Sequence, residues 1–150
     1  MILSERYTTL NRALQLMREQ IIESTIYVDK NFRKLNTPED IFNFLKIRTT
    51  YKKDPKGVEL FQSTRTLFEN NYWGIEGCGD CDCFSITALA FLLANGFRDC
   101  GIVLVGRNPS TPVHIYVYCV VDENIEYLDL TNNYFNFERP YKFKQLIPFN

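Results

Sequence analysis

Hydrophobic residues recur with a helical period in the first part of the chain and with a strand period further on. Between Ser4 and Ile22 they come at steps of three and four, at Tyr7, Leu10, Leu14, Met17 and Ile21. Ser4 is a residue type that caps helices, so we expect a helix from Ser4 to about Ile22. From Val113 to Val121 every second residue is aliphatic or cysteine, which predicts a strand with one buried face.

A second helix is predicted by the residues at its start. Thr37 is a capping residue, Pro38 suits the first helical position, and two acidic residues follow. The buried face would consist of Ile41, Phe42, Phe44, Leu45 and Ile47. The helix should end near Tyr51, because the Asp-Pro-Lys-Gly sequence at residues 54–57 is typical of a turn.

Shorter elements are expected on either side of this helix. Residues 25–28, Thr-Ile-Tyr-Val, predict a short strand. Residues 63–69 predict a short helix, and residues 70–80 predict a loop because they are rich in Asn and Gly.

The most apolar segment of the chain predicts a helix that is buried on nearly all sides. It runs from Cys81 to Asn95 and has almost no polar face. Asp80 or Gly79 is the expected cap. Gly96 should end the helix, because glycine tolerates the left-handed conformation found after many helices.

Strands follow this helix. Residues 101–105 predict one strand, and residues 125–130 predict the return strand of a hairpin with residues 113–121. The aromatic and basic tail is expected to add an edge strand around residues 141–143. Together these elements predict one α+β domain, in which helices pack on an antiparallel sheet of about three to five strands.

Composition and charge narrow the possible functions. The 150 residues are 45% hydrophobic, with nine tyrosines and twelve phenylalanines, which is enough for one core. The net charge is −1 and no basic run stands out, which argues against nucleic-acid binding. No apolar run reaches membrane-spanning length and the N-terminus lacks a signal-peptide pattern, so we expect a cytoplasmic location. Five cysteines, three of them between residues 78 and 83, favour reduced thiols over a secreted disulfide framework.

The cysteine that opens the apolar helix is the best candidate for chemistry. Cys81 lies in the first turn, where the positive end of the helix dipole favours a thiolate. A thiolate nucleophile also needs an imidazole to handle a proton and an acceptor to orient that imidazole. The chain has a single histidine, so the imidazole must belong to His114. Asp129, at the end of the neighbouring strand, is the candidate acceptor.

The hairpin makes the pairing of His114 with Asp129 testable. A two-residue turn at residues 122–123 makes His114 oppose Thr131 and makes Asp129 its diagonal neighbour on the same face. A three-residue loop would place Asp129 on the opposite face. We therefore expect an even-numbered loop, or a bulge that restores the register.

The order of these features resembles the transglutaminase-like branch of the papain-fold cysteine enzymes. That family has a capped helix, an Asp-Pro turn followed by Glu and often Gln, a Gly-Asp-Cys-Asp segment that opens the core helix, and two strands carrying His and Asp. The matching segments are Thr37–Phe42, Asp54–Ser63, Gly79–Asp82, Val113–Val117 and Tyr127–Thr131. The resemblance covers residues 37–131, with a helical extension at 1–36 and a tail at 132–150. It departs from the family pattern at Cys78 and at Cys83, where many members have Asp.

The resemblance implies a papain-like core and thiol-dependent amide hydrolysis or acyl transfer on a protein or peptide substrate, without a cofactor or a metal. Cys81 would be the nucleophile, His114 the base and Asp129 the orienting group. Gln62 would supply an oxyanion donor beside the Cys81 backbone N–H, unless it is an ordinary surface glutamine. Trp73 is expected either to line the substrate channel or to fill the core.

A non-catalytic role fits the same residues. Papain-like domains also serve as structural or interaction modules after catalysis is lost, here in a larger assembly such as a phage particle. The helix at residues 4–22 would then dock to a protein partner, and the protein would be virion-associated. A Cys81 that is open to solvent beside His114 favours the enzyme, whereas a Cys81 that a partner covers favours the module.

The clustered cysteines leave two further alternatives. The thiols between residues 78 and 83 could bind zinc together with Cys100, Cys119 or His114. Cys78 and Cys81 could instead form a redox pair, although the βαβ context of such pairs is missing.

Overall fold

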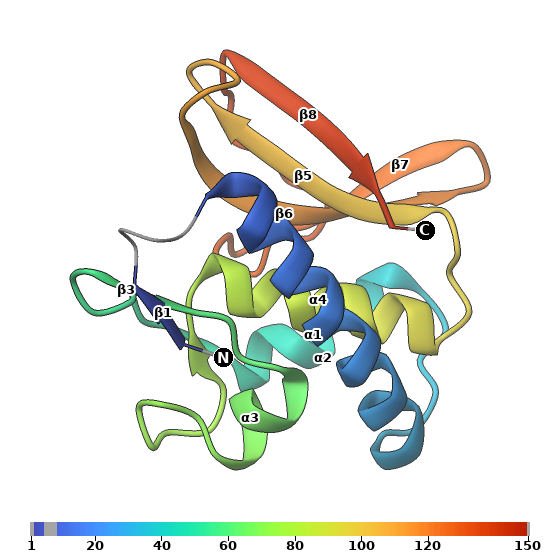
Figure 1. The fold of residues 1–150 in the computed structure, drawn as a ribbon. Coiled ribbons are helices and arrows are strands. Elements are labelled where there is room, and N and C mark those ends of the chain that lie inside the picture. Colours follow the sequence, from blue (N-terminus) through green and yellow to red (C-terminus); the bar gives the residue numbers. More distant parts are fainter. Residues whose placement is uncertain (1, 5–8, 150) are drawn as a thin grey trace.

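The computed structural model describes the backbone of residues 2–4 and all of residues 9–149. Its helices lie on one side of a four-stranded antiparallel sheet, as Figure 1 shows. This arrangement confirms the α+β class expected from the sequence.

Side-chain caps explain where the helices begin. The helices are α1 (Leu10–Asn31), α2 (Pro38–Arg48), α3 (Thr64–Glu69) and α4 (Cys81–Ala94). Thr37 caps α2 by accepting a hydrogen bond from the backbone N–H of Asp40 at 3.0 Å. Ser63 and Asp80 cap α3 and α4 in the same way. The predicted starts of α2, α3 and α4 are therefore confirmed.

α1 begins later than predicted. Thr9 is its cap, and Ser4 belongs to a short strand, β1 (Ile2–Ser4). The prediction that Ser4 caps a helix at residues 4–22 is wrong, because a second capping residue follows five positions later and precedes the same apolar stripe. Tyr7, which was placed on that stripe, lies outside the described residues.

α1 also continues further than predicted, through the segment at residues 25–28 that was expected to form a strand. The buried residues of the helix recur at steps of three and four and include Met17, Ile21, Ser24 and Val28. Packing of this stripe on α4 therefore outweighs the strand preference of the β-branched residues.

The main sheet has the strand order β7-β6-β5-β8, and all its neighbouring strands are antiparallel. Its strands are β5 (Cys100–Gly106), β6 (Pro112–Val121), β7 (Asn124–Leu128) and β8 (Phe143–Pro148). The edge strand predicted around residues 141–143 is present as β8, shifted towards the C-terminus. Two short pairs lie apart from this sheet: β1 with β3 (Val58–Leu60), and β2 (Thr50–Tyr51) with β4 (Cys78–Gly79).

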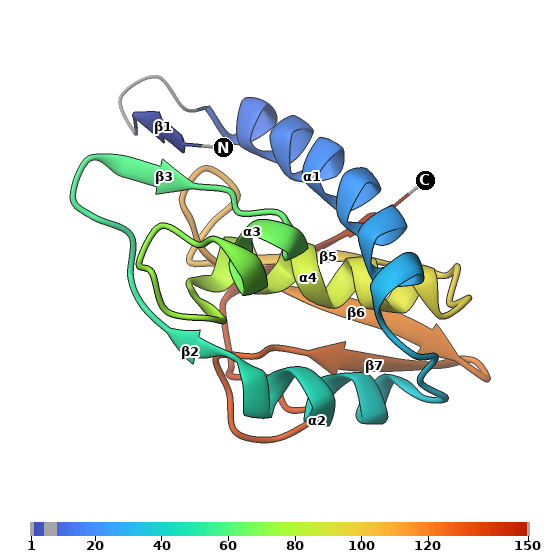
Figure 2. The same ribbon diagram turned by 90° about the horizontal axis from the view of Figure 1, so that it is seen from below.

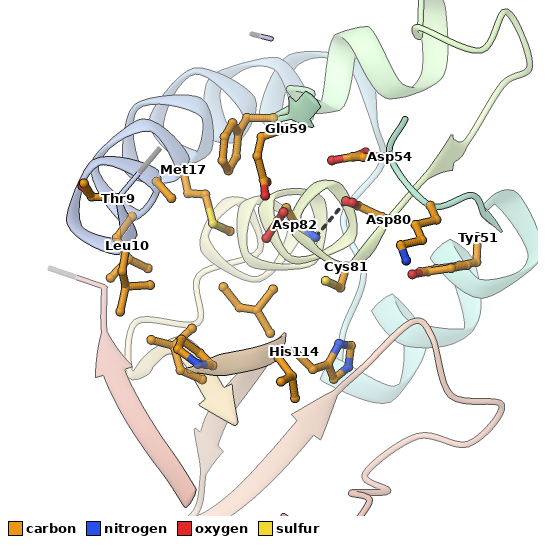
Figure 3. Close-up of a pocket in the computed structure, with 18 residues that line it drawn as sticks. Thr9, Leu10, Met17, Tyr51, Asp54, Glu59, Asp80, Cys81, Asp82 and His114 are labelled. Carbon is orange, nitrogen blue, oxygen red and sulfur yellow. Dashed lines mark hydrogen bonds between the residues drawn. The ribbon is translucent and has the colours of Figure 1, made fainter. Parts of the chain in front are cut away.

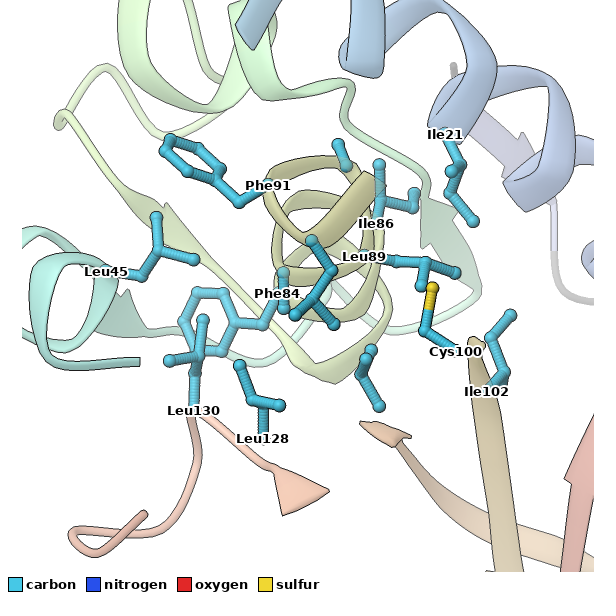
Figure 4. Packing of buried hydrophobic residues seen from close by; sticks show 14 of the residues in the cluster. Ile21, Leu45, Phe84, Ile86, Leu89, Phe91, Cys100, Ile102, Leu128 and Leu130 are labelled. Carbon is cyan, nitrogen blue, oxygen red and sulfur yellow. The ribbon is translucent and has the colours of Figure 1, made fainter. Parts of the chain in front are cut away.

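α4 is the centre of the core. In Figure 2 it lies in the middle, with α1 and α3 on one side and β7 and α2 on the other, and its residues from Cys83 to Leu92 are all buried. In Figure 4, Ile21 of α1 and Leu45 of α2 approach it from the helical side, and Leu128 approaches it from the sheet. The predicted burial on nearly all sides is confirmed. None of the helices in the described part of the chain combines the length and apolar character needed to cross a membrane.

The end of α2 differs from the prediction. The helix stops at Arg48 rather than near Tyr51, and β2 follows. Ile47 was assigned to the buried face but is 84% exposed. Its position lies about 200° around the helix from Leu45, which is fully buried, so the two cannot share a face.

Candidate active site

Cys81 is the first residue of α4, and the preceding chain holds it in place. β4 runs parallel to β2 just before the helix. Gly77 allows this approach because its φ is +79° and a Cβ there would lie 1.8 Å from the carbonyl oxygen of Arg48. Asp80 then caps α4 by accepting a hydrogen bond from the Asp82 N–H at 3.2 Å. The Gly-Cys-Gly-Asp sequence thus fixes where the thiol lies.

The β6–β7 hairpin brings His114 and Asp129 together. Residues 122–123 form a two-residue turn with positive φ at both positions, which is typical of a type I′ turn. Val117 pairs with Leu128, so the register is the predicted one. The Nε2 atom of His114 lies 2.7 Å from Oδ2 of Asp129. This contact leaves Nδ1 as the ring nitrogen available to a second partner.

Several donors hold the Asp129 carboxylate. The backbone N–H of Thr131 donates to Oδ1 at 3.0 Å and its hydroxyl donates at 2.7 Å, while Nδ2 of Asn132 donates to Oδ2 at 3.2 Å. Burial alone would raise the pKa of Asp129, but the hydrogen bonds and charge of His114 and the Thr131 donors hold it below its usual value. Asp129 is therefore charged at neutral pH and acts as a fixed acceptor.

Cys81 and His114 line the same cleft, which has a volume of about 400 Å³ (Figure 3). The backbone N–H of Ile115 hydrogen-bonds to the Cys81 sulfur, which places the thiol beside the residue that follows His114. Cys81 is partly exposed, whereas the other four cysteines are buried. A solute that enters the cleft therefore meets one thiol near the only imidazole of the chain.

The electrostatic surroundings of Cys81 differ from the expectation. Burial raises the pKa of the Cys81 thiol, and the negative charges of Asp82 and Asp80 raise it further. The Ile115 N–H lowers it but does not compensate. The prediction that the helix dipole favours a thiolate is wrong for this site, because burial and two adjacent carboxyl groups outweigh the dipole. A base must remove the proton when the sulfur reacts.

Four carboxyl groups also line the cleft, and we call them the acidic wall: Asp54, Glu59, Asp80 and Asp82. Burial, the charges of Asp82 and Asp54 and a hydrogen bond with Asp54 raise the pKa of Asp80 to about 9. Burial, together with the charge and a hydrogen bond of Glu59, raises the pKa of Asp82 to about 7. The positions of Asp54 and Glu59 beside Cys81 were not expected from the sequence. The Asp-Pro turn followed by Glu was the available signal.

One group of side chains within residues 9–149 has a spacing that could hold a metal ion. The ligand atoms of Asp54, Asp80 and Asp82 lie within 4.8 Å of one another. Acidic side chains often gather without an ion, and we assign no metal to them. Cysteine and histidine ligands form no such group in the described chain, so the zinc alternative lacks its geometry there.

Gln62 and Trp73 lie outside the lining of the cleft. Gln62 is 3% exposed, so it is not a surface glutamine. Its Nε2 donates to the Cys78 carbonyl at 3.1 Å, and its Oε1 accepts from the Tyr72 N–H at 2.9 Å. The Gln62 amide thus ties the loop at Tyr72 to β4. Trp73 packs edge-on against Tyr72, and the Lys52 ammonium lies 5.0 Å from the centre of its ring.

The other four cysteines are buried among core residues. All five thiols are free, as the sequence predicted. The Cys83 thiol donates to the Leu60 carbonyl at 3.4 Å and, like Cys100 and Cys119, is almost fully buried. Cys83 therefore joins α4 to β3 as a small core residue.

Comparison with protein-family models, with curated proteins and with solved structures finds no match to this chain. A functional conclusion therefore depends on the geometry of the cleft.

Proposed function

We propose that this protein is a cysteine-dependent amide hydrolase or acyltransferase in which Cys81 is the nucleophile, His114 the base and Asp129 the group that orients His114. One observation carries the proposal: the accessible thiol and the single imidazole, itself hydrogen-bonded to a buried carboxylate, line one cleft. The resemblance of the surrounding motifs to the transglutaminase-like branch of the papain-fold enzymes supports the same chemistry and a papain-like core.

Acylation would begin with proton transfer from the Cys81 thiol to Nδ1 of His114, because Nε2 is held by Asp129. The sulfur attacks the amide carbonyl carbon as the proton leaves, and the carbonyl electron pair moves to oxygen. The backbone N–H of Cys81 has no acceptor within its own helix and is the natural donor to that oxyanion. The C–N bond then breaks, the imidazolium gives its proton to the leaving amine, and a thioester remains.

Deacylation repeats these steps with a second nucleophile. Water, or an amine in the transfer reaction, loses a proton to His114 and attacks the thioester carbonyl. The C–S bond breaks, the sulfur regains a proton from the imidazolium, and the product is a carboxylic acid or a new amide. Because the pKa of Cys81 is raised, catalysis depends on His114 as a general base rather than on a preformed thiolate.

Alkylation with iodoacetamide at neutral pH, mapped by mass spectrometry, tests the proposed pair. We expect Cys81 to react at least about tenfold faster than the four buried cysteines. His114→Gln should slow the reaction of Cys81 by at least about tenfold, because glutamine cannot take the proton. Cys100 is an internal control that should react only after unfolding. If Cys81 is alkylated at the same rate in wild type and in His114→Gln, the proposed enzymatic function is wrong and the non-catalytic module is favoured.

The acyl intermediate can be examined in the same two proteins with p-nitrophenyl acetate. Wild type should form an acetyl thioester on Cys81, and water or added methylamine should then release it. If acetyl groups appear on lysines but not on Cys81, the proposed nucleophile is wrong.

A further inference from the structure

The cleft has two unlike walls. The acidic wall lies next to the proposed nucleophile, since Asp80 and Asp82 flank Cys81 in sequence and lie close to it in Figure 3. Much of the rest of the lining is apolar, and we call these residues the apolar wall: Leu10, Ala13, Leu14, Met17, Leu104 and Ile115. Figure 3 shows Leu10 on α1, at the end of the cleft away from Asp80.

Apolar side chains at this cleft remain open to solvent. Leu10 is 42% exposed and Val113, from the start of β6, is 65% exposed, although both line the cavity. A ligand with an apolar side chain would remove this surface from water, which is favourable in proportion to the area covered. The apolar wall therefore fits an aliphatic or aromatic group rather than a sugar or a phosphate.

The acidic wall sets the sign of charge that the cleft accepts. The charged groups acting most strongly on Asp80 are Asp82 and Asp54, and those acting on Asp82 are Glu59 and Asp54. Carboxyl groups this close repel one another when they are ionised, so they must share protons. An incoming cation would form ion pairs with the carboxylates and so replace their mutual repulsion. Among the described residues, the lining has one lysine, Lys53, and the four carboxyl groups of the acidic wall. An anionic group beside Cys81 would be repelled.

We propose that the cleft binds a peptide segment whose basic residue lies beside the carbonyl that Cys81 attacks and whose preceding residue is apolar. The basic side chain contacts the acidic wall, and the apolar side chain contacts Leu10 and its neighbours on the apolar wall. This inference rests on the proposed function and names the substrate class for it.

A set of four peptidyl chloromethyl ketones tests the two walls separately. The probes are acetyl-Leu-Lys, acetyl-Leu-Glu, acetyl-Gly-Lys and acetyl-Gly-Glu chloromethyl ketones. Each alkylates a thiol through displacement of chloride by sulfur, so the rate of modification at Cys81 reports binding and reactivity together. We expect the Lys probes to react at least about tenfold faster than their Glu counterparts, and the Leu-Lys probe to react fastest. Reaction rates with free cysteine in solution correct for intrinsic reactivity.

Matched variants connect each preference to its wall. Glu59→Gln should reduce the ratio of Lys-probe to Glu-probe rates by about threefold or more, whereas Glu19→Gln on the exposed side of α1 should leave the ratio unchanged. Leu10→Ser should reduce the ratio of Leu-probe to Gly-probe rates, whereas Ile22→Ser, an exposed change on the same helix, should leave it unchanged.

The outcomes separate this inference from the proposed function. If all four probes modify Cys81 at the same corrected rate in a His114-dependent manner, the substrate class is wrong and the proposed enzyme stands. A preference for the Glu probes also overturns the substrate class. If neither the probes nor iodoacetamide modify Cys81 selectively, the proposed function fails and this inference fails with it.

Discussion

The Asp129 carboxylate receives more hydrogen bonds than a neutral amide could accept in its place. His114, both donors of Thr131 and the side chain of Asn132 all point to its two oxygens. An amide in this position would turn an NH₂ group towards at least one of these donors. The orientation of the imidazole therefore depends on the charge and the double acceptor capacity of Asp129.

Asp129→Asn should consequently impair the site while preserving the size of the side chain. If the new NH₂ group donates to Nε2, the imidazole proton moves to Nδ1, and Nδ1 can no longer take the proton of Cys81. We expect the iodoacetamide rate at Cys81 to fall at least about tenfold, with an unchanged circular dichroism spectrum. Asp99→Asn, an exposed change, is the control. A folded Asp129→Asn protein that reacts at the wild-type rate would show that Asp129 does not orient the base.

The contrast between His114 and Cys81 shows what can be predicted for single residues. The contact of His114 with Asp129 follows from strand alternation and from the length of one turn, so local sequence was sufficient. The raised pKa of Cys81 was not predictable, because it depends on burial and on the packing of carboxyl groups around the helix start. The burial of Gln62 was not predictable for the same reason, since its partners come from segments that only the fold brings near.

The β6–β7 hairpin is the element that sets the distance between the proposed base and its partner. Its turn has Asp122 at φ +49° and Glu123 at φ +70°. Side chains rarely adopt this conformation, and Asp-Gly is among the sequences that favour a type I′ turn. The two-residue turn thus keeps the register that brings His114 to Asp129, although the strained backbone of the turn lowers the stability of the protein.

Glu123→Gly should therefore stabilise the protein. Glycine removes the strain of positive φ at the second turn position, and we expect a gain of about 1 kcal/mol in the free energy of unfolding, or about 2–4 °C in the melting temperature. Thermal unfolding followed by circular dichroism is the measurement. Glu126→Gly, within β7, is the matched control and should lower the melting temperature. A lower melting temperature for Glu123→Gly would mean that the Glu123 side chain contributes more than its backbone strain costs.

Among the helices, capping residues were good predictors of where a helix begins, except at Ser4. The caps expected at Thr37 and Asp80 each mark a real helix start, and Ser63 caps the short helix that was expected at residues 63–69. The strand predicted at residues 25–28 failed because the preference of β-branched residues is weak compared with burial on α4. The short strands β3 and β4 had no alternating pattern, since their two- or three-residue lengths are set by pairing with distant segments.

The whole molecule concentrates acidic groups from separate segments at one end of the central helix. Asp54 precedes β3, Glu59 lies within it, and Asp80 and Asp82 belong to the start of α4. Folding brings these groups out of water and near one another, which keeps protons on carboxyl groups that would be ionised in the unfolded chain. The acidic wall therefore couples the stability of the entire domain to pH.

The sign of this coupling follows from the direction of the shifts. The pKa values of about 9 for Asp80 and about 7 for Asp82 lie above the ordinary value of about 3.9 for an unfolded aspartate. Between pH 5 and pH 8 the folded state thus binds more protons than the unfolded state, and the free energy of unfolding falls as the pH rises. Each such proton contributes a slope of at most about 1.4 kcal/mol per pH unit. Asp129 has the opposite shift, so it affects stability only at lower pH.

Asp80→Asn should flatten this dependence, because asparagine caps a helix as well as aspartate does but does not titrate. Urea unfolding at several pH values from 5 to 8 should show a decline in wild-type stability and a smaller decline in the variant. Asp40→Asn, an exposed change, should keep the wild-type slope. If wild type becomes more stable from pH 5 to pH 8, or if Asp80→Asn shows the full wild-type slope, Asp80 does not hold its proton in the folded protein. The acidic wall would then be ionised in the free protein, which would remove the predicted pH dependence of stability but leave the attraction of a basic substrate in place.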